Sequence, residues 1–203
     1  MNAASTTSES HCDLESVIAT EQLDLRPRRR MEADLENRII IPMTLELAKS
    51  PENFFPKLVK AALEVSQADS TGISLLNKEE GRFVWPAVAG KLDCYIGSGT
   101  PSDFGPCGTV LDRQSTLLFI HPEKYFTYLE PIRPPLEEVL LVPFYMDGKP
   151  VGTIWAVIHE KRRKFDAEDR RLLESLSNFA ATAYQMLLKF GALEPLLRVK
   201  DAA

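Results

Sequence analysis

The most apolar part of the chain is a pair of segments that flank Asp147-Gly148. Asp-Gly between two apolar runs predicts a β-hairpin, because both residues tolerate the positive φ angles of a type I′ turn. A two-residue loop pairs Met146 with Lys149 and so defines the register. One face of the hairpin would then carry Leu140, Val142 and Phe144 opposite Val151, Thr153 and Trp155. Because both faces are apolar, we expect other parts of the chain to cover each of them.

Apolar residues recur at helical spacing in three further segments, residues 32–48, 54–65 and 172–187. Pro42 lies inside the first segment and predicts a kink or a late helix start. The second helix should begin near Ser50 or Asn53. The third can be capped by Asp166 and is expected to stop at Gly191.

Short strands are predicted at residues 71–76, 82–88 and 117–120. Residues 89–115 are rich in glycine and proline, which predicts irregular chain with at most a short helix near residues 109–113. The resulting order of elements indicates an α+β domain, an antiparallel sheet with helices on one face. Loops between residues 89 and 137 are then the only material left to cover the other face.

Residues 1–30 contain few large apolar side chains. We expect a disordered or partly helical tail, with a short helical piece around residues 14–23. Its basic cluster, Arg26, Arg28, Arg29 and Arg30, either contacts an anionic surface or belongs to a solvated linker.

The 203 residues suffice for one domain with extensions, and 44% hydrophobic with 26% charged residues is a globular composition. A net charge of −5 argues against nucleic-acid binding. The sequence contains neither an apolar run long enough for a membrane span nor the apolar segment of a signal peptide, so we expect a cytoplasmic protein without membrane contact. Cys12, Cys94 and Cys107 form neither a disulfide framework nor a metal knuckle.

A loop-covered apolar sheet face with a few polar groups is the usual setting of a small-molecule pocket. The candidates to line it are Trp85, Phe104, Cys107, His121, Tyr125, Phe144 and Trp155. Each aromatic residue could instead simply fill the core. Cys107 is either a reactive thiol, activated by a following helix N-terminus, or a small buried hydrophobic residue, as most free cysteines are. The sequence shows no metal-ligand spacing and no catalytic constellation.

Several segments resemble a GAF domain of the kind found in bacterial sensor histidine kinases and related signalling proteins. They are Asp-Phe-Gly-Pro-Cys-Gly-Thr-Val-Leu-Asp-Arg at 103–113, His-Pro-Glu-Lys-Tyr-Phe at 121–126, Leu-Leu-Val-Pro-Phe at 140–144, Gly-Thr-Ile-Trp at 152–155 and Phe-Asp-Ala-Glu-Asp at 165–169. The resemblance covers about residues 34–190. It implies a six-stranded antiparallel sheet with a ligand cavity, and a domain at 31–190 followed by a tail at 191–203.

The resemblance also implies a non-catalytic sensory module that binds a small ligand or senses redox state. GAF domains often form homodimers through their terminal helices. The stripe with Ala180 and Ala183 and the apolar N-terminal helix either offer such a surface here or only cover their own sheet. A histidine kinase or another signalling protein is the expected partner, and because no kinase core follows residue 190 we expect a standalone module or one domain of a longer protein. The residues before Phe165 lack the Asn-Lys pair of cyclic-nucleotide binders, and Cys107 is followed by Gly108 where bilin binders have histidine.

Two alternatives remain open at this point. Free methionine sulfoxide reductases are GAF-like and use cysteines in the region of Cys94 and Cys107, although a full set of resolving cysteines is missing. A dimerisation module with a collapsed pocket is the other alternative. The cofactor or ligand itself is not identified by the sequence.

Overall fold

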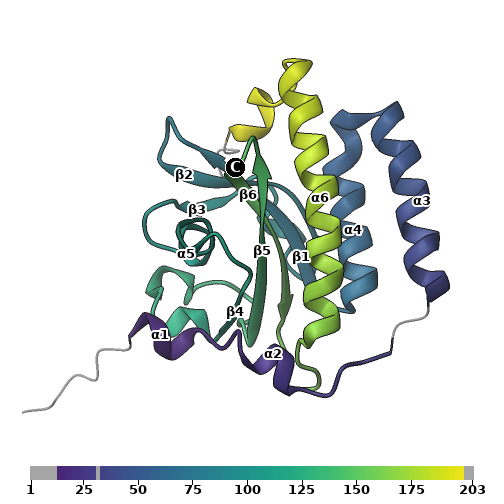
Figure 1. Cartoon of the computed structure of the whole chain (residues 1–203). Coiled ribbons are helices and arrows are strands. Elements are labelled where there is room, and N and C mark those ends of the chain that lie inside the picture. Colours follow the sequence, from purple (N-terminus) through teal and green to yellow (C-terminus); the bar gives the residue numbers. More distant parts are fainter. Residues whose placement is uncertain (1–12, 31–32, 199–203) are drawn as a thin grey trace, which may run out of the picture.

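A six-stranded antiparallel sheet, in the order β3-β2-β1-β6-β5-β4, organises the computed structural model, which describes residues 13–30 and 33–198 (Figure 1). The strands are β1 (Ser70–Asn77), β2 (Arg82–Gly90), β3 (Gly99–Pro101), β4 (Leu117–Ile120), β5 (Glu138–Met146) and β6 (Lys149–Ile158). Every predicted strand is present. Strand β3 was not predicted, because three residues are too few to show an alternating pattern.

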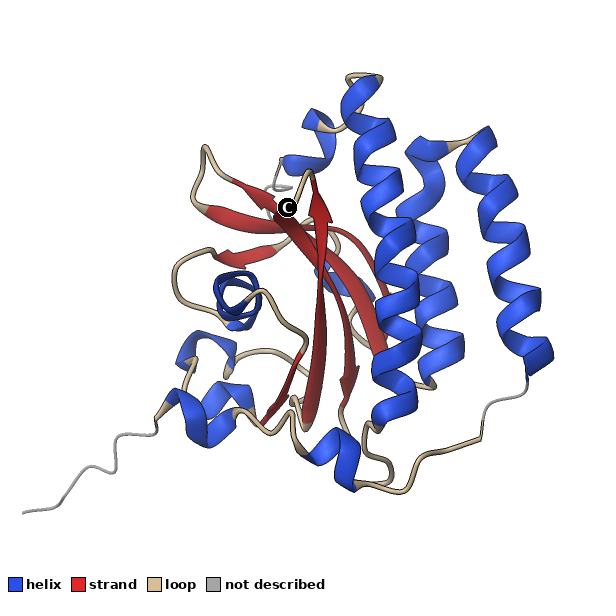
Figure 2. Ribbon diagram, viewed as in Figure 1, coloured by secondary structure: helices blue, strands red, loops and turns tan. Residues whose placement is uncertain are grey.

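Helices cover one face of this sheet, and loops with one short helix cover the other (Figure 2). The helices are α1 (Leu14–Val17), α2 (Gln22–Leu25), α3 (Ala33–Lys49), α4 (Phe54–Ser66), α5 (Pro106–Arg113) and α6 (Ala167–Lys189). Single 3₁₀ turns are η1 (Pro51–Asn53), η2 (Asp93–Tyr95), η3 (Pro122–Lys124), η4 (Thr127–Leu129) and η5 (Glu194–Leu197). Helix α3 begins at Ala33 and continues through Pro42, so the predicted late start is wrong.

Helices α4 and α6 pack directly on the sheet, while α3 packs on the outer side of α4 (Figure 1). The core between helices and sheet includes Leu58 and Val59 of α4, Ile73 of β1, Ile154 of β6 and Leu173 of α6. Ala180 and Ala183 of α6 are fully buried in this core. This alanine stripe therefore packs inside its own chain, and the argument that it offers a surface to a second copy is wrong.

The β5–β6 hairpin contains an irregularity that changes its faces. Met146 pairs with Lys149 and Tyr145 with Pro150, as predicted, but Phe144 pairs with Gly152 because a bulge lies between these positions. One extra residue in β6 moves every later side chain to the opposite face. The prediction that Trp155 shares a face with Val142 and Phe144 is therefore wrong. Trp155 lies on the loop side with Leu141, opposite the helices.

Residues 13–30, which we call the N-terminal strap, run along the β4 edge of the sheet (Figure 1). The backbone N–H of Ala19 donates to the carbonyl of Leu118 at 2.8 Å, and Val17 and Leu23 are buried. The short helical piece expected here is present as α1 and α2, and the strap also packs on the rest of the domain, which the sequence did not predict. Residues 1–12 of the predicted tail lie outside the described residues.

Two arginines of the basic cluster hold the strap in place. Arg26 forms two parallel hydrogen bonds with the carboxylate of Glu138 at 2.8 and 2.9 Å, and Arg29 pairs with Asp169 at 2.7 Å. Both carboxylates are buried and need such partners. These arginines are therefore structural, and neither interpretation of the cluster from sequence describes them.

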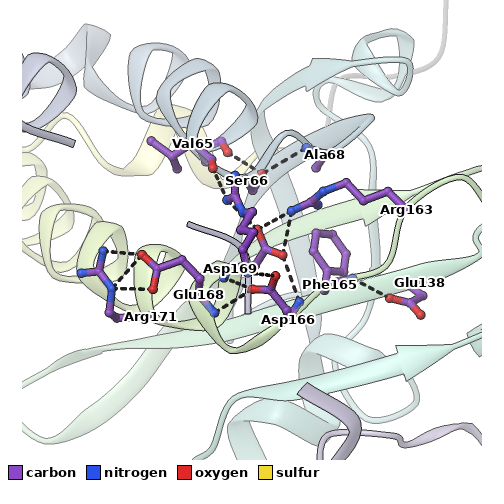
Figure 3. A network of polar contacts seen from close by, with 12 residues as sticks. Val65, Ser66, Ala68, Glu138, Arg163, Phe165, Asp166, Glu168, Asp169 and Arg171 are labelled. Atoms are coloured by element: carbon purple, nitrogen blue, oxygen red, sulfur yellow. Dashed lines mark hydrogen bonds and ion pairs between the residues drawn. The ribbon is translucent and has the colours of Figure 1, made fainter. Parts of the chain in front are cut away.

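The buried end of α6 gathers the polar groups drawn in Figure 3. Asp166 caps the helix, accepting from the N–H groups of Glu168 and Asp169, and the Asp169 side chain accepts in return from the N–H of Asp166. Arg163 donates to both carboxylate oxygens of Asp169 at 2.8 Å. This capping box confirms the predicted helix start and connects the strap to α6.

Candidate functional site

A cavity of about 50 Å³ lies between the sheet and the loops, on the side away from the long helices. Alternation along β5 and β6 supplies one wall, because every second residue points to the loop side. The lining residues are Trp85, Leu92, Thr100, Pro106, Cys107, Pro122, Leu129, Ile132, Leu136, Val139, Leu141, Trp155 and Val157. About 10–15 Å³ suffices for one water molecule, so the cavity accommodates several waters or a very small ligand.

Two tryptophans form the sheet wall, with their rings edge-to-face at 5.5 Å. Gly72 makes room for Trp155, since a Cβ at this glycine would lie 2.2 Å from the indole ring. The indole N–H of Trp155 donates to the hydroxyl of Ser74 at 3.0 Å. The indole N–H of Trp85, by contrast, is buried and has no hydrogen-bond partner among the residues that the structure describes.

Cys107 lies in the first turn of α5, with its side chain buried in the cavity wall. Its Sγ donates to the Ser74 hydroxyl at 3.4 Å and accepts from the Thr153 hydroxyl at 3.5 Å. Burial raises the pKa of the Cys107 thiol, more than these hydroxyl groups lower it. The thiol is therefore protonated near neutral pH, and the structure supports the buried-residue interpretation over the activated one. Cys94 is also a free thiol, exposed on the surface.

A second hollow of about 290 Å³ adjoins the cavity. It is lined by Trp85, Tyr95, Ser98, Gly99, Thr100, Tyr128, Leu129, Pro131 and Ile132. Four of these residues also line the cavity, namely Trp85, Thr100, Leu129 and Ile132. Since Pro131 is exposed, the second hollow reaches the surface and is the natural entrance.

Buried polar atoms gather at the boundary between the two hollows. Within the described residues, the buried hydroxyls of Thr100 and Tyr128 form no hydrogen bond of good geometry, although Thr100 lies close enough to lower the pKa of Tyr128, and the Trp85 N–H has no partner. Burial raises the pKa of Tyr128, and the neighbouring Cys107 adds to the shift, so the phenol is protonated. Gly105 allows this hydroxyl to approach the backbone, because a Cβ there would lie 2.4 Å from it. Native proteins leave few buried polar atoms unpaired, so the Trp85 N–H calls for a binding partner, and the two hydroxyls beside it are free to reorient towards one.

Of the sequence-predicted site residues, Trp85, Cys107 and Trp155 line the cavity, and four do not. Phe104 is 42% exposed and packs on Tyr125, whose ring centre is 5.6 Å away. His121 lies between Glu123 and Glu137, at 3.2 and 3.4 Å from their carboxylate oxygens.

Phe144 packs on Tyr184 of α6, on the opposite face of the sheet from the cavity. The bulge in β6 explains why Phe144 and Trp155, which were predicted to share a face, lie on opposite faces. Sequence reasoning missed Thr100, Tyr128, Leu129 and Ile132, because they lie in a three-residue strand and in loops that show no periodic pattern. The glycine and proline content around them did indicate the loop layer to which they belong.

Within residues 13–30 and 33–198, acidic, histidine and cysteine side chains form no group of three or more that could hold a metal ion. None of the helices in the same ranges is long and apolar enough to cross a membrane. The potential nucleophiles in the cavity wall are the protonated thiol of Cys107 and the hydroxyl of Thr100, and the residues that line the cavity include no histidine or carboxylate.

Known structures share this architecture at low sequence identity. The GAF domain of a phosphoenolpyruvate-protein phosphotransferase from Acinetobacter is 19% identical, with a TM-score of 0.68 over 80% of this chain and 97% of that one. The free methionine-R-sulfoxide reductase of Neisseria meningitidis, solved with its substrate, is 15% identical, with a TM-score of 0.61 over 81% and 97%. The second GAF domain of DevS from Mycobacterium smegmatis is 20% identical, with a TM-score of 0.57 over 70% and 99%.

No curated protein sequence matches the chain. Similarity to solved structures at such identities concerns the fold, and it agrees with the predicted six-stranded sheet between helices and loops. The sequence model of the GAF domain matches residues 48–185, which include the complete sheet and most of α6. Fold and sequence thus lead to the same result, and the chain belongs to the GAF domain family.

Proposed function

We propose that this GAF domain is a non-catalytic sensory module of signal transduction, which binds a small ligand in the cavity on the loop side of the sheet. The observation that carries the proposal is the pair of features found there together. The cavity has an apolar wall, and at its edge the Trp85 N–H has no partner among the described residues, beside the hydroxyls of Thr100 and Tyr128. Apolar pockets with a few convergent polar groups are the usual form of small-molecule sites.

The strap offers a route by which occupancy of the cavity could reach the rest of the protein. Val139 lines the cavity, and the preceding residue Glu138 holds Arg26 of the strap. Val17 of the strap also packs in the loop-side core. A ligand that moves the start of β5 would therefore shift the strap, which leads towards α3. This relay is part of the proposal.

Reduction of free methionine sulfoxide is less well supported than sensing. The substrate is an amino acid with an ammonium and a carboxylate group, and burying either group without a partner is unfavourable. No charged side chain lines the cavity, and the Cys107 thiol is protonated. Redox sensing by Cys107 meets the same obstacle, because a protonated, buried thiol reacts slowly.

Association of two copies through the terminal helices stays a prediction, but the surface that we now expect to form the contact lies on α3. Helix α3 exposes Ile41 and Leu45, which lie one turn apart with 61% and 58% of their surface accessible. We propose that a second copy covers them. Light scattering at tens of micromolar should report a dimer for the native chain and a monomer for Ile41→Glu; a native monomer would contradict the proposal.

A thermal-shift screen of metabolites tests the ligand-binding function. A ligand that binds only the folded state, at a hundred times its Kd, stabilises it by about 2.7 kcal/mol. We expect at least one hit whose shift is lost in Val157→Phe, which fills the cavity, and kept in Cys94→Ser, which changes the surface. If Val157→Phe proves unfolded, Thr100→Val takes its place. No hit, or the same shift in both variants, would contradict the proposal.

A further inference from the structure

The cavity and the second hollow are unusual in having entirely neutral walls. None of their lining residues carries a charge. Three of the charged groups on the neighbouring segments are engaged elsewhere: Glu138 with Arg26, Asp69 with Lys91 and Arg162, and the Arg133 guanidinium with the carbonyls of Glu130 and Ile132. An ionised ligand would therefore be buried here without a counter-ion, which is strongly unfavourable.

The polar atoms at the boundary define which ligand atom they can bind. An indole N–H can only donate, so Trp85 requires an acceptor. Trp85 is 7% and Thr100 5% exposed, and both side chains line the cavity. The hydroxyls of Thr100 and Tyr128 can donate as well. A single ligand oxygen with two lone pairs could accept from Trp85 and from one hydroxyl together.

We propose that the ligand is a compact, uncharged molecule with an apolar body and a carbonyl-type oxygen that accepts a hydrogen bond from Trp85. This inference rests on the proposed function and names the class of ligand. The oxygen lies at the boundary beside Thr100, and the apolar body packs on Val139, Leu141 and Val157. The cavity of about 50 Å³ suits a body of a few carbon atoms. A longer ligand extends past Leu129 and Ile132 into the second hollow.

Three probes of equal size and branching test the proposal: methyl isopropyl ketone, isobutyrate, and the alkene in which a CH₂ group replaces the ketone oxygen. The chain contains two tryptophans, so an NMR titration can follow both indole N–H signals and assign them with Trp85→Phe. We expect the ketone to shift the Trp85 signal, the alkene to bind about fivefold more weakly, and isobutyrate not to bind. A fivefold difference in Kd corresponds to the net contribution of about one ordinary hydrogen bond.

Variants separate recognition from mere packing. Trp85→Phe should remove the preference for the ketone over the alkene while both still bind, and Thr100→Val, of nearly the same shape, should reduce it. Binding in these variants is followed through the Trp155 signal and by thermal shift. Because ketone and alkene are compared in the same variant, a general loss of stability would weaken the binding of both and would not change the preference.

Each outcome decides a different claim. Isobutyrate binding as tightly as the ketone would overturn the uncharged class and leave the sensory function standing. A ketone preference that persists in Trp85→Phe would overturn the role of Trp85. Failure of all three probes to bind, in a chain shown to be folded, would overturn this inference, whereas the metabolite screen decides the ligand-binding function separately.

Discussion

The pair between Arg26 and Glu138 leads to a quantitative prediction about the strap. Replacing Arg26 with Met keeps an unbranched apolar side chain but removes both hydrogen bonds to the carboxylate. Glu138, only 1% exposed, would then retain the backbone N–H of Phe165 at 3.0 Å as its partner. The substitution thus leaves a buried charge nearly uncompensated.

Removing one partner of a buried ion pair destabilises a protein by about 3–5 kcal/mol. The Arg26 side chain is 13% exposed, so water reaches part of the pair and we expect the lower end, about 3 kcal/mol. Arg170→Met is the matched control, because Arg170 forms a similar two-pronged pair with Asp24 whose side chains are 27% and 56% exposed. Exposed pairs of this kind contribute about 0–1 kcal/mol.

Equilibrium unfolding in urea measures both variants, and the slope of free energy against denaturant shows whether the strap has detached before the rest unfolds. Adding Glu138→Gln to Arg26→Met should recover part of the loss, since the amide carries no charge. A loss below about 1 kcal/mol for Arg26→Met, equal to that of Arg170→Met, would refute the reasoning that a buried pair holds the strap.

Two further predictions concern titratable groups. His159 donates through Nδ1 to the Pro135 carbonyl at 2.7 Å, and burial lowers the pKa of its imidazole, so the unfolded chain takes up the proton first. The stability that neutral His159 contributes should be fully present above the unfolded pKa of about 6.5, and it should fall as the pH drops from there through the folded pKa. Urea unfolding at several pH values should show this dependence, and His159→Gln should flatten it. In a Cys12→Ser background, Cys94 should react with a thiol reagent in the folded chain and Cys107 only after unfolding, because burial blocks it and raises its pKa; rapid reaction of both thiols would contradict this.

The local sequence pattern predicted most of the fold, and it failed where contacts between residues far apart in the sequence determine the structure. Alternation and the Asp-Gly turn identified the β5–β6 hairpin, but the bulge beside Phe144 depends on how β6 packs on its neighbours. Composition suggested a tail at residues 1–30, because the partners of Arg26 and Arg29 lie 112 and 140 positions away in the sequence. No local signal reports such pairs.

The residues of the candidate site likewise fall into those that the local pattern could predict and those that it could not. Trp85 and Trp155 lie in strands, and Cys107 stands at the start of a helix with a clear motif, so sequence reasoning could find them. Thr100 and Tyr128 become interesting only because folding buries their hydroxyls without a hydrogen bond of good geometry among the described residues. A missing hydrogen bond is a property of the folded chain, and it has no counterpart in a residue pattern.

The position of the strap also bears on whether sheets of different molecules can pair edge to edge. Strand β4 ends the sheet on one side, and an uncovered edge strand offers unpaired backbone groups to other molecules. Ile18 bridges to Phe119, and Ala19 pairs with Leu118, so the strap covers this edge, while β3 at the other edge has only three residues. A chain shortened to begin at residue 31 would keep every strand of the GAF sheet and yet lose the cover of its longer edge. The strap therefore occupies backbone groups of β4 with which a strand of another molecule could otherwise pair.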